Sequence, residues 1–171
     1  TAYEIRNCDW SSDVCSSDLE ILSRQIERTR TYFLDLTKEQ ALFRLAPHEW
    51  SIKEIISHLI DVERIFSYRA ICFARGETQT LPGFEQEEYV RAANADSRDL
   101  QDLVDELVHV RRANLLAFKH LTDETGRQLG TVMGTKVSVR ALLYIIAGHE
   151  LYHFEDIRDK YLPAFAAQNN A

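Results

Sequence analysis

Four segments of the sequence carry apolar residues at the three- and four-residue spacing of an amphipathic α-helix. They cover residues 19–36, 51–75, 97–121 and 138–162 of a chain of 171. A long helix with one apolar stripe is stable only when that stripe packs against other helices. Few segments alternate as strands do, and the sequence contains no internal repeat. We therefore predict an all-α fold, a four-helix bundle whose helices are antiparallel or joined by a crossover.

The composition is typical of a soluble globular domain, with 45% hydrophobic and 27% charged residues. The formal net charge is -7, whereas a nucleic-acid-binding surface is usually basic. No apolar run is long enough to span a bilayer, and no signal-peptide pattern is present. We therefore expect a cytoplasmic protein with neither nucleic-acid nor membrane partners.

The two ends of the chain read differently from the middle. Residues 1–19 show no sustained period, are rich in Ser and Asp in their second half, and resemble translated sequencing-adaptor read-through. We interpret them as a non-native or disordered leader, residues 20–165 as the bundle, and residues 166–171 as a disordered tail. The three cysteines, Cys8, Cys15 and Cys72, are odd in number and irregularly spaced, so they predict no disulfide framework.

Capping residues mark the ends of the predicted helices. Ser51 and Glu54 form a capping box, in which the hydroxyl accepts from the backbone N–H of Glu54 and the carboxylate reaches back. We expect that helix to stop at Gly76. Ser138 caps the last helix, which we expect to end before Pro163.

Two connections between helices carry features of their own. Residues 77–96 form a long connection with a turn at Pro82 and Gly83 and room for a short surface helix near Tyr89. Such a connection either covers a pocket or only spans the bundle. Residues 122–137 are rich in glycine and predict a brief extended excursion.

Two histidines lie on the apolar stripe of the last helix. His149 and His153 follow Leu142 and Ile146 at steps of three and four residues. Side chains four residues apart stand one above the other, so both imidazoles can bind a single ion. A buried polar group without a partner costs about 1–3 kcal/mol, which a metal would avoid for both rings.

A third histidine lies on the inward face of the helix that Ser51 begins. His58 is in line with Ile55, Val62 and Ile65. Three neutral imidazoles with open positions left for water or substrate are typical of catalytic metal sites. The spacing of His58, His149 and His153 favours one divalent metal, zinc or nickel first, and leaves open that they are ordinary core histidines.

The segment His149–His153 also fits H-E-x-x-H, the zinc metalloprotease pattern in which the glutamate is the general base. Such enzymes commonly take a third ligand from further downstream, and after Asp159 the chain contains no Asp, Glu or His. A peptidase is therefore the least favoured activity. Glu150 lies about 100° around the helix from His149 and faces either solvent or a neighbouring helix.

Two carboxylates can orient the histidines. Asp61 follows His58 by three residues, and Asp156 follows His153 by three. Either carboxylate can accept the free ring N–H and fix the tautomer, or can simply be a solvated surface group.

Five other candidate residues are interpreted as surface groups, with binding of an anionic cofactor left open for the two arginines. They are His48, His109, His120, Arg111 and Arg112.

Two stretches together resemble signatures of the DinB superfamily, of the DinB/YfiT-like type. Residues 49–63, EWSIKEIISHLIDVE, combine an aromatic residue, a Ser cap, a glutamate and a histidine four residues later; residues 148–153, GHELYH, carry the histidine pair. The similarity covers about residues 20–163. It implies a four-helix bundle, often dimeric, that binds a divalent metal through the matching residues His58, His149 and His153.

The resemblance also suggests an activity. Characterised relatives include transferases and isomerases that use low-molecular-weight thiols. We therefore expect a metal-dependent enzyme, a thiol S-transferase or a hydrolase, with a small-molecule substrate and a possible thiol cofactor. A non-enzymatic, stress-associated metal-binding bundle and a metal-free structural bundle are the alternatives.

Overall fold

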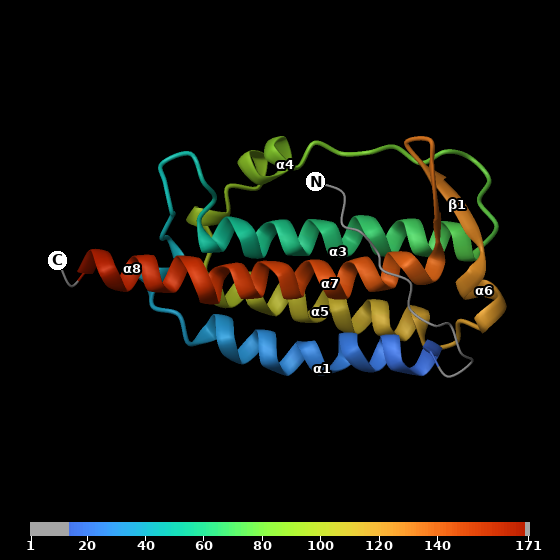
Figure 1. Cartoon of the computed structure of the whole chain (residues 1–171), viewed down its shortest axis with the longest axis horizontal. Coiled ribbons are helices and arrows are strands. Elements are labelled where there is room, and N and C mark those ends of the chain that lie inside the picture. The colour runs from blue at the N-terminus through green and yellow to red at the C-terminus, as the bar shows by residue number, and fades with distance from the viewer. Residues whose placement is uncertain (1–13, 170–171) are drawn as a thin grey trace.

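The structure is a computed structural model that describes the backbone of residues 14–169 and the side chains of residues 19–169. Four long helices form a bundle, as predicted, and Figure 1 shows them side by side. They are α1 (Val14–Leu34), α3 (Ile52–Ala74), α5 (Leu100–Phe118) and α7 (Val139–Asp156). The shorter elements are α2 (Lys38–Ala41), α4 (Gln86–Ala93), η1 (Ala95–Ser97), α6 (Asp123–Arg127), β1 (Leu129–Val132), β2 (Thr135–Ser138), η2 (Ile157–Tyr161) and α8 (Leu162–Asn169).

The connectivity is that of a crossover bundle. Helix α3 packs against α5 and α7, and α1 packs against the same two helices. Residues 75–99 run back along the length of α3 before α5 begins, so α3 and α5 point the same way (Figure 1). Helices α1 and α7 are also parallel, since Gln25 bonds Ala147 and Thr29 bonds Glu150 further along both helices. The short α4 and its flanking segments therefore lie outside the bundle, over α3.

The predicted caps are confirmed. The Ser51 hydroxyl accepts from the backbone N–H of Glu54 at 3.1 Å, and the carboxylate of Glu54 accepts from the Ser51 N–H at 2.9 Å. Ser138 likewise caps α7 by accepting from the backbone N–H of Ala141 at 3.1 Å. These bonds use helix N–H groups that have no intrahelical partner, so they fix where α3 and α7 begin.

Helices extend further toward both ends of the chain than expected. Helix α1 begins at Val14, within the segment interpreted as a non-native or disordered leader, while residues 1–13 lie outside the described part. At the other end, α7 passes through a π-helical turn, η2, into α8, which continues beyond Pro163 to Asn169. Residues 166–169 are therefore helical, not a tail. Pro163 is tolerated because the π-helical turn before it shifts the register of the backbone bonds, with the Leu162 N–H donating to the Ile157 carbonyl five residues back.

The core has two apolar halves with a polar layer between them. One half contains Phe33, Ile52, Ile56, Leu103 and Ile157, and the other contains Leu22, Phe73, Phe118, Leu142 and Ile146. Between them along the helices lie five buried polar side chains: Gln25, Thr29, Glu63, Arg111 and Glu150. No described helix is long and apolar enough to cross a membrane.

A small hairpin closes one end of the bundle, in the segment predicted to be extended. Strands β1 and β2 pair antiparallel, and Met133 and Gly134 turn between them with φ of 48° and 82°. The hairpin also holds the long connection, because Leu81 donates its N–H to the Thr131 carbonyl and accepts from the Met133 N–H. The connection is therefore fixed near α3.

Candidate metal centre

Three histidines from two helices meet at the seam between α3 and α7. The Nε2 atom of His149 lies 3.2 Å from Nε2 of His58 and 3.2 Å from Nε2 of His153. One ligand nitrogen from each ring lies within 4.8 Å of the other two. The structure thus brings together all three residues that the sequence singled out.

The separations suit a shared ion. Nitrogens about 2.0–2.1 Å from one zinc ion, at tetrahedral or octahedral angles, lie about 2.8–3.4 Å apart. The two 3.2 Å separations fall in that range. The donor set consists of imidazole nitrogens alone, which suits zinc, nickel, copper or iron better than magnesium or calcium. The residues present therefore fit a divalent transition metal.

Burial keeps the three rings neutral. His58 is buried, while His149 and His153 are half-buried. Burial, together with a smaller effect of the neighbouring histidines on His58 and His153, lowers the pKa to about 4 for His58 and His149 and to about 3 for His153. At pH 7 each ring thus has a lone pair free, the form that binds metal.

Two aromatic residues flank the triad. The Trp50 ring lies 4.8 Å from the His58 ring, and its Nε1 donates to Glu87 of α4 at 3.1 Å. The half-exposed Tyr152 lies 5.1 Å from the His153 ring. In the sequence Trp50 stands out only as part of the signature, although its position next to the Ser51 cap is a signal that places it near the start of α3 and so near His58.

A buried ion-pair network lies directly behind the triad. Arg111 of α5 donates to both carboxylate oxygens of Glu63, each at 2.8 Å, and to Glu150 of α7 at 2.7 Å. Thr29 of α1 donates to the other oxygen of Glu150. Arg111 is only 3% exposed, so its assignment to a solvated face was wrong. Two carboxylates neutralise the guanidinium and make its burial tolerable.

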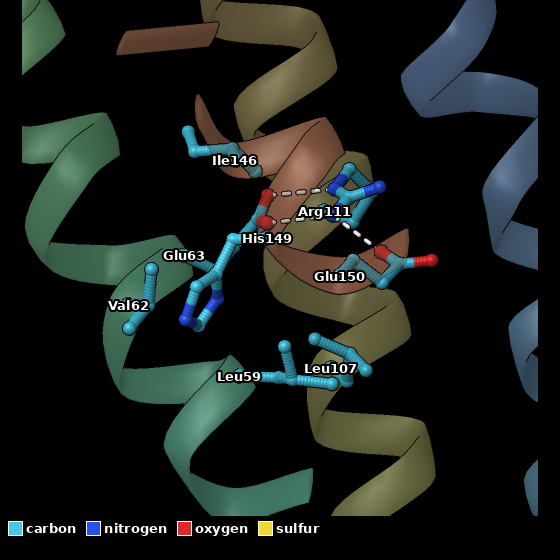
Figure 2. A pocket seen from close by; sticks show the side chains of 8 residues that line it. All are labelled: Leu59, Val62, Glu63, Leu107, Arg111, Ile146, His149 and Glu150. Carbon is cyan, nitrogen blue, oxygen red and sulfur yellow. Dashed lines mark hydrogen bonds and ion pairs between the residues drawn. The ribbon is translucent and has the colours of Figure 1, made fainter. Parts of the chain in front are cut away.

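His149 and Glu150 point in different directions (Figure 2). The imidazole projects toward Leu59 and Val62 of α3, whereas the Glu150 carboxylate projects toward Arg111. The surrounding side chains leave no volume for a water-sized molecule. Glu150 is therefore engaged as a structural anion and is not available as the general base that H-E-x-x-H implies in a peptidase.

The two carboxylates expected to orient the histidines do not do so. Asp156 pairs with Lys160 on the helix surface. Asp61 is half-buried, which raises its pKa, but it makes no hydrogen bond to His58. Among the described residues, Nδ1 of His58 is buried without any hydrogen-bond partner. A spacing of three residues along the helix thus places the Asp61 carboxylate on the same face as the His58 ring but does not direct it at the ring nitrogen.

Four of the five residues that we interpreted as surface groups are exposed, as predicted. His48, His109, His120 and Arg112 are exposed. Arg111 is the exception described above.

Fold and site together define a crossover four-helix bundle with a three-histidine centre that can hold a metal. The model of the DinB superfamily matches residues 21–157, and the chain belongs to that superfamily. Among solved structures it is similar to YfiT from Bacillus subtilis, described as "a probable metal-dependent hydrolase with an unusual four-helix bundle topology". The TM-score is 0.81 at 14% identity, over 92% of this chain and 90% of that one. No curated protein matches the chain.

Proposed function

We propose that this protein is a metal-dependent enzyme, in the first place a hydrolase of small molecules, with His58, His149 and His153 as the metal ligands. The observation that carries the proposal is the convergence of three neutral imidazoles on one point. Two of the rings are only half-buried. A catalytic metal site keeps an open position whereas a structural one is closed, and the partial exposure of these rings favours the first.

The side chains of the protein would hold the metal ion and orient the reactants, and the ion would supply the reactivity. When bound, a divalent ion supplies Lewis acidity, which lowers the pKa of water or of a thiol and makes it nucleophilic near neutral pH. The three imidazoles fix the place at which this happens. The pair of Arg111 with Glu150 holds α7 in register, which sets the position of the adjacent His149.

The nucleophile is either water or a low-molecular-weight thiol. Water gives hydrolysis, in keeping with the description of YfiT. A thiol gives S-transfer, which the family resemblance suggests. Zinc and nickel remain the first candidates for the ion. The cytoplasmic location and the homodimer stay predictions.

The test combines metal analysis with turnover. The purified protein should contain close to one equivalent of divalent metal by mass spectrometry, and His149→Ala should lose it. The matched control is His48→Ala, which removes an exposed imidazole that faces only Glu49. Turnover should be assayed on activated esters and amides and on a model electrophile with several thiols, and should fall at least about 100-fold in His149→Ala.

Three other outcomes of these measurements would lead to different conclusions. Stoichiometric metal without turnover on any substrate would favour a non-enzymatic metal-binding bundle. A protein without metal after growth in metal-replete medium would favour a structural bundle. Metal retained in full by His149→Ala would contradict the ligand assignment.

A further inference from the structure

A groove of about 330 Å³ lies between α3 and the long connection outside the bundle. Arg64, Tyr68 and Arg69 line it from α3, and Pro82, Phe84 and Tyr89 line it from the connection. Its size is that of a small-molecule site. The long connection therefore does line a pocket, which was one of the two alternatives that its length allowed.

Arg69 is a buried cation without an anion. Its side chain is 6% exposed, its Nη2 donates to the Pro82 carbonyl at 2.8 Å, and its guanidinium carbon lies 5.0 Å from the centre of the Phe66 ring and 5.9 Å from that of Phe84. Within the described part of the chain no carboxylate lies within ion-pair distance of it. Arg111, which is equally buried, has two. A buried charge is costly unless it is paired, so Arg69 indicates an anionic ligand.

The neighbours of Arg69 narrow the ligand class. Arg64, the other cation of the groove, is paired with Glu106 at 2.6 Å, a carboxylate that it shares with Arg98, so Arg69 is the cation of the groove lining that has no carboxylate partner. A single guanidinium binds a carboxylate through two parallel hydrogen bonds. Tyr68 and Tyr89 are 59% and 47% exposed and offer aromatic surface to an apolar body. The groove therefore suits an organic monoanion, a carboxylate with an aromatic or alkyl body.

The groove and the triad share two elements. Ile65 and Arg69 follow His58 by seven and eleven residues, so they lie on the same face of α3, about 10 and about 16 Å further along the axis. On α4, Glu87 bonds Trp50 beside His58, and Tyr89 lines the groove. Both sites thus lie along one face of α3 under one segment.

We infer that the groove binds the carboxylate end of the substrate, with Arg69 as the anion-binding residue, while the reacting group lies at the metal centre. This inference rests on the proposed function for its second half. The first half, selective binding of a carboxylate by Arg69, stands independently and can be measured without turnover.

Calorimetric titration of 4-phenylbutyrate and of its neutral amide tests the inference. The full chain is first stripped of metal with a chelator, so that the carboxylate has no metal to bind. The acid should bind and the amide should bind more weakly, by about 10- to 100-fold, the usual worth of a charged hydrogen bond. Arg69→Met should weaken binding of the acid by a similar factor and leave the amide unchanged.

Two more variants complete the design. Tyr68→Ala, at an exposed groove position, should weaken both ligands several-fold without touching the fold, and it keeps the test valid if Arg69→Met does not fold. Leu116→Ala, at a 71% exposed position on α5 outside the groove, should change neither. Equal affinity for acid and amide, or an unchanged acid affinity in folded Arg69→Met, would overturn the inference.

The two proposals fail separately. Selective carboxylate binding without metal-dependent turnover would support the inference about the groove and contradict the proposed function. Metal-dependent turnover with the same KM for carboxylate-bearing and amide-capped substrates would do the reverse.

Discussion

Arg111 of α5 and Glu150 of α7 form a buried ion pair at 2.7 Å, and Glu150 is the neighbour in sequence of the metal-ligand candidate His149. The pair joins a helix that carries no triad residue to the one that carries two. The packing of α7 against α5 therefore helps to fix the positions of the His149 and His153 imidazoles.

Replacing Arg111 by Met should destabilise the fold by about 3–5 kcal/mol, because Glu63 and Glu150 would remain buried without a cation. Urea unfolding of the metal-free protein measures this. Arg112→Met, next in sequence but exposed and paired only with Glu27 at 3.2 Å, should stay within about 0.5 kcal/mol of the parent. Equal effects of the two variants would contradict the role of the network.

The metal-free protein should lose stability as pH falls from 6.5 to about 4. In the unfolded chain each triad histidine takes up a proton near its ordinary pKa of 6.5, while in the folded chain the pKa values are about 4 for His58 and His149 and about 3 for His153. The unfolded state binds more protons in that window, so acid favours it, and above 6.5 the effect is absent. Thermal unfolding at a series of pH values measures the slope.

A triple variant tests the origin of that slope. With Gln in place of His58, His149 and His153, stability should vary less between pH 6.5 and 4. His48→Ala should leave the slope as it is, since His48 is exposed. A slope that the triple variant leaves unchanged would assign it to carboxylates instead.

Nickel should quench the fluorescence of Trp50, whose ring lies 4.8 Å from that of His58. Titration of the stripped protein should give a saturable loss of emission at one equivalent. Trp50→Phe should abolish this response, and Trp10→Phe should keep it. A response carried by Trp10 alone would show that nickel binds elsewhere.

Ser51→Ala should cost about 0.5–2 kcal/mol, the usual worth of a helix cap. The cost should exceed that of Ser138→Ala, because the Ser51 hydroxyl also donates to Asp96 at 2.5 Å. Urea unfolding of the two variants compares them. A smaller effect at Ser51 would mean that the bond to Asp96 adds nothing.

The sequence predicts well what depends on local spacing. The helical period, the capping box of Ser51 with Glu54 and the cap at Ser138 need only neighbours within a turn, and all appear as expected. His58, His149 and His153 meet because each lies on the apolar stripe of its own helix, and two stripes of a bundle must face each other.

What the sequence missed depends on distant partners. Arg111 looks like a surface residue until Glu63 and Glu150, 48 and 39 residues away, are known to lie beside it. Asp61 has the right spacing to reach His58, yet spacing along a helix fixes only which face a carboxylate occupies. The passage of the last helix beyond Pro163 depends on the π turn before it, which shifts the register of the backbone bonds.

The parallel course of α3 and α5 forces residues 75–99 to travel outside the bundle. The metal ligands and the outer wall of the groove therefore belong to different segments of the chain. The helices that carry the imidazoles pack in the core, where few substitutions are tolerated. The outer wall of the groove is formed largely by a strap, residues 82–89, none of which is buried in the core. Changes of sequence in that strap can therefore retune which molecule is accepted while leaving the ion-holding scaffold as it is.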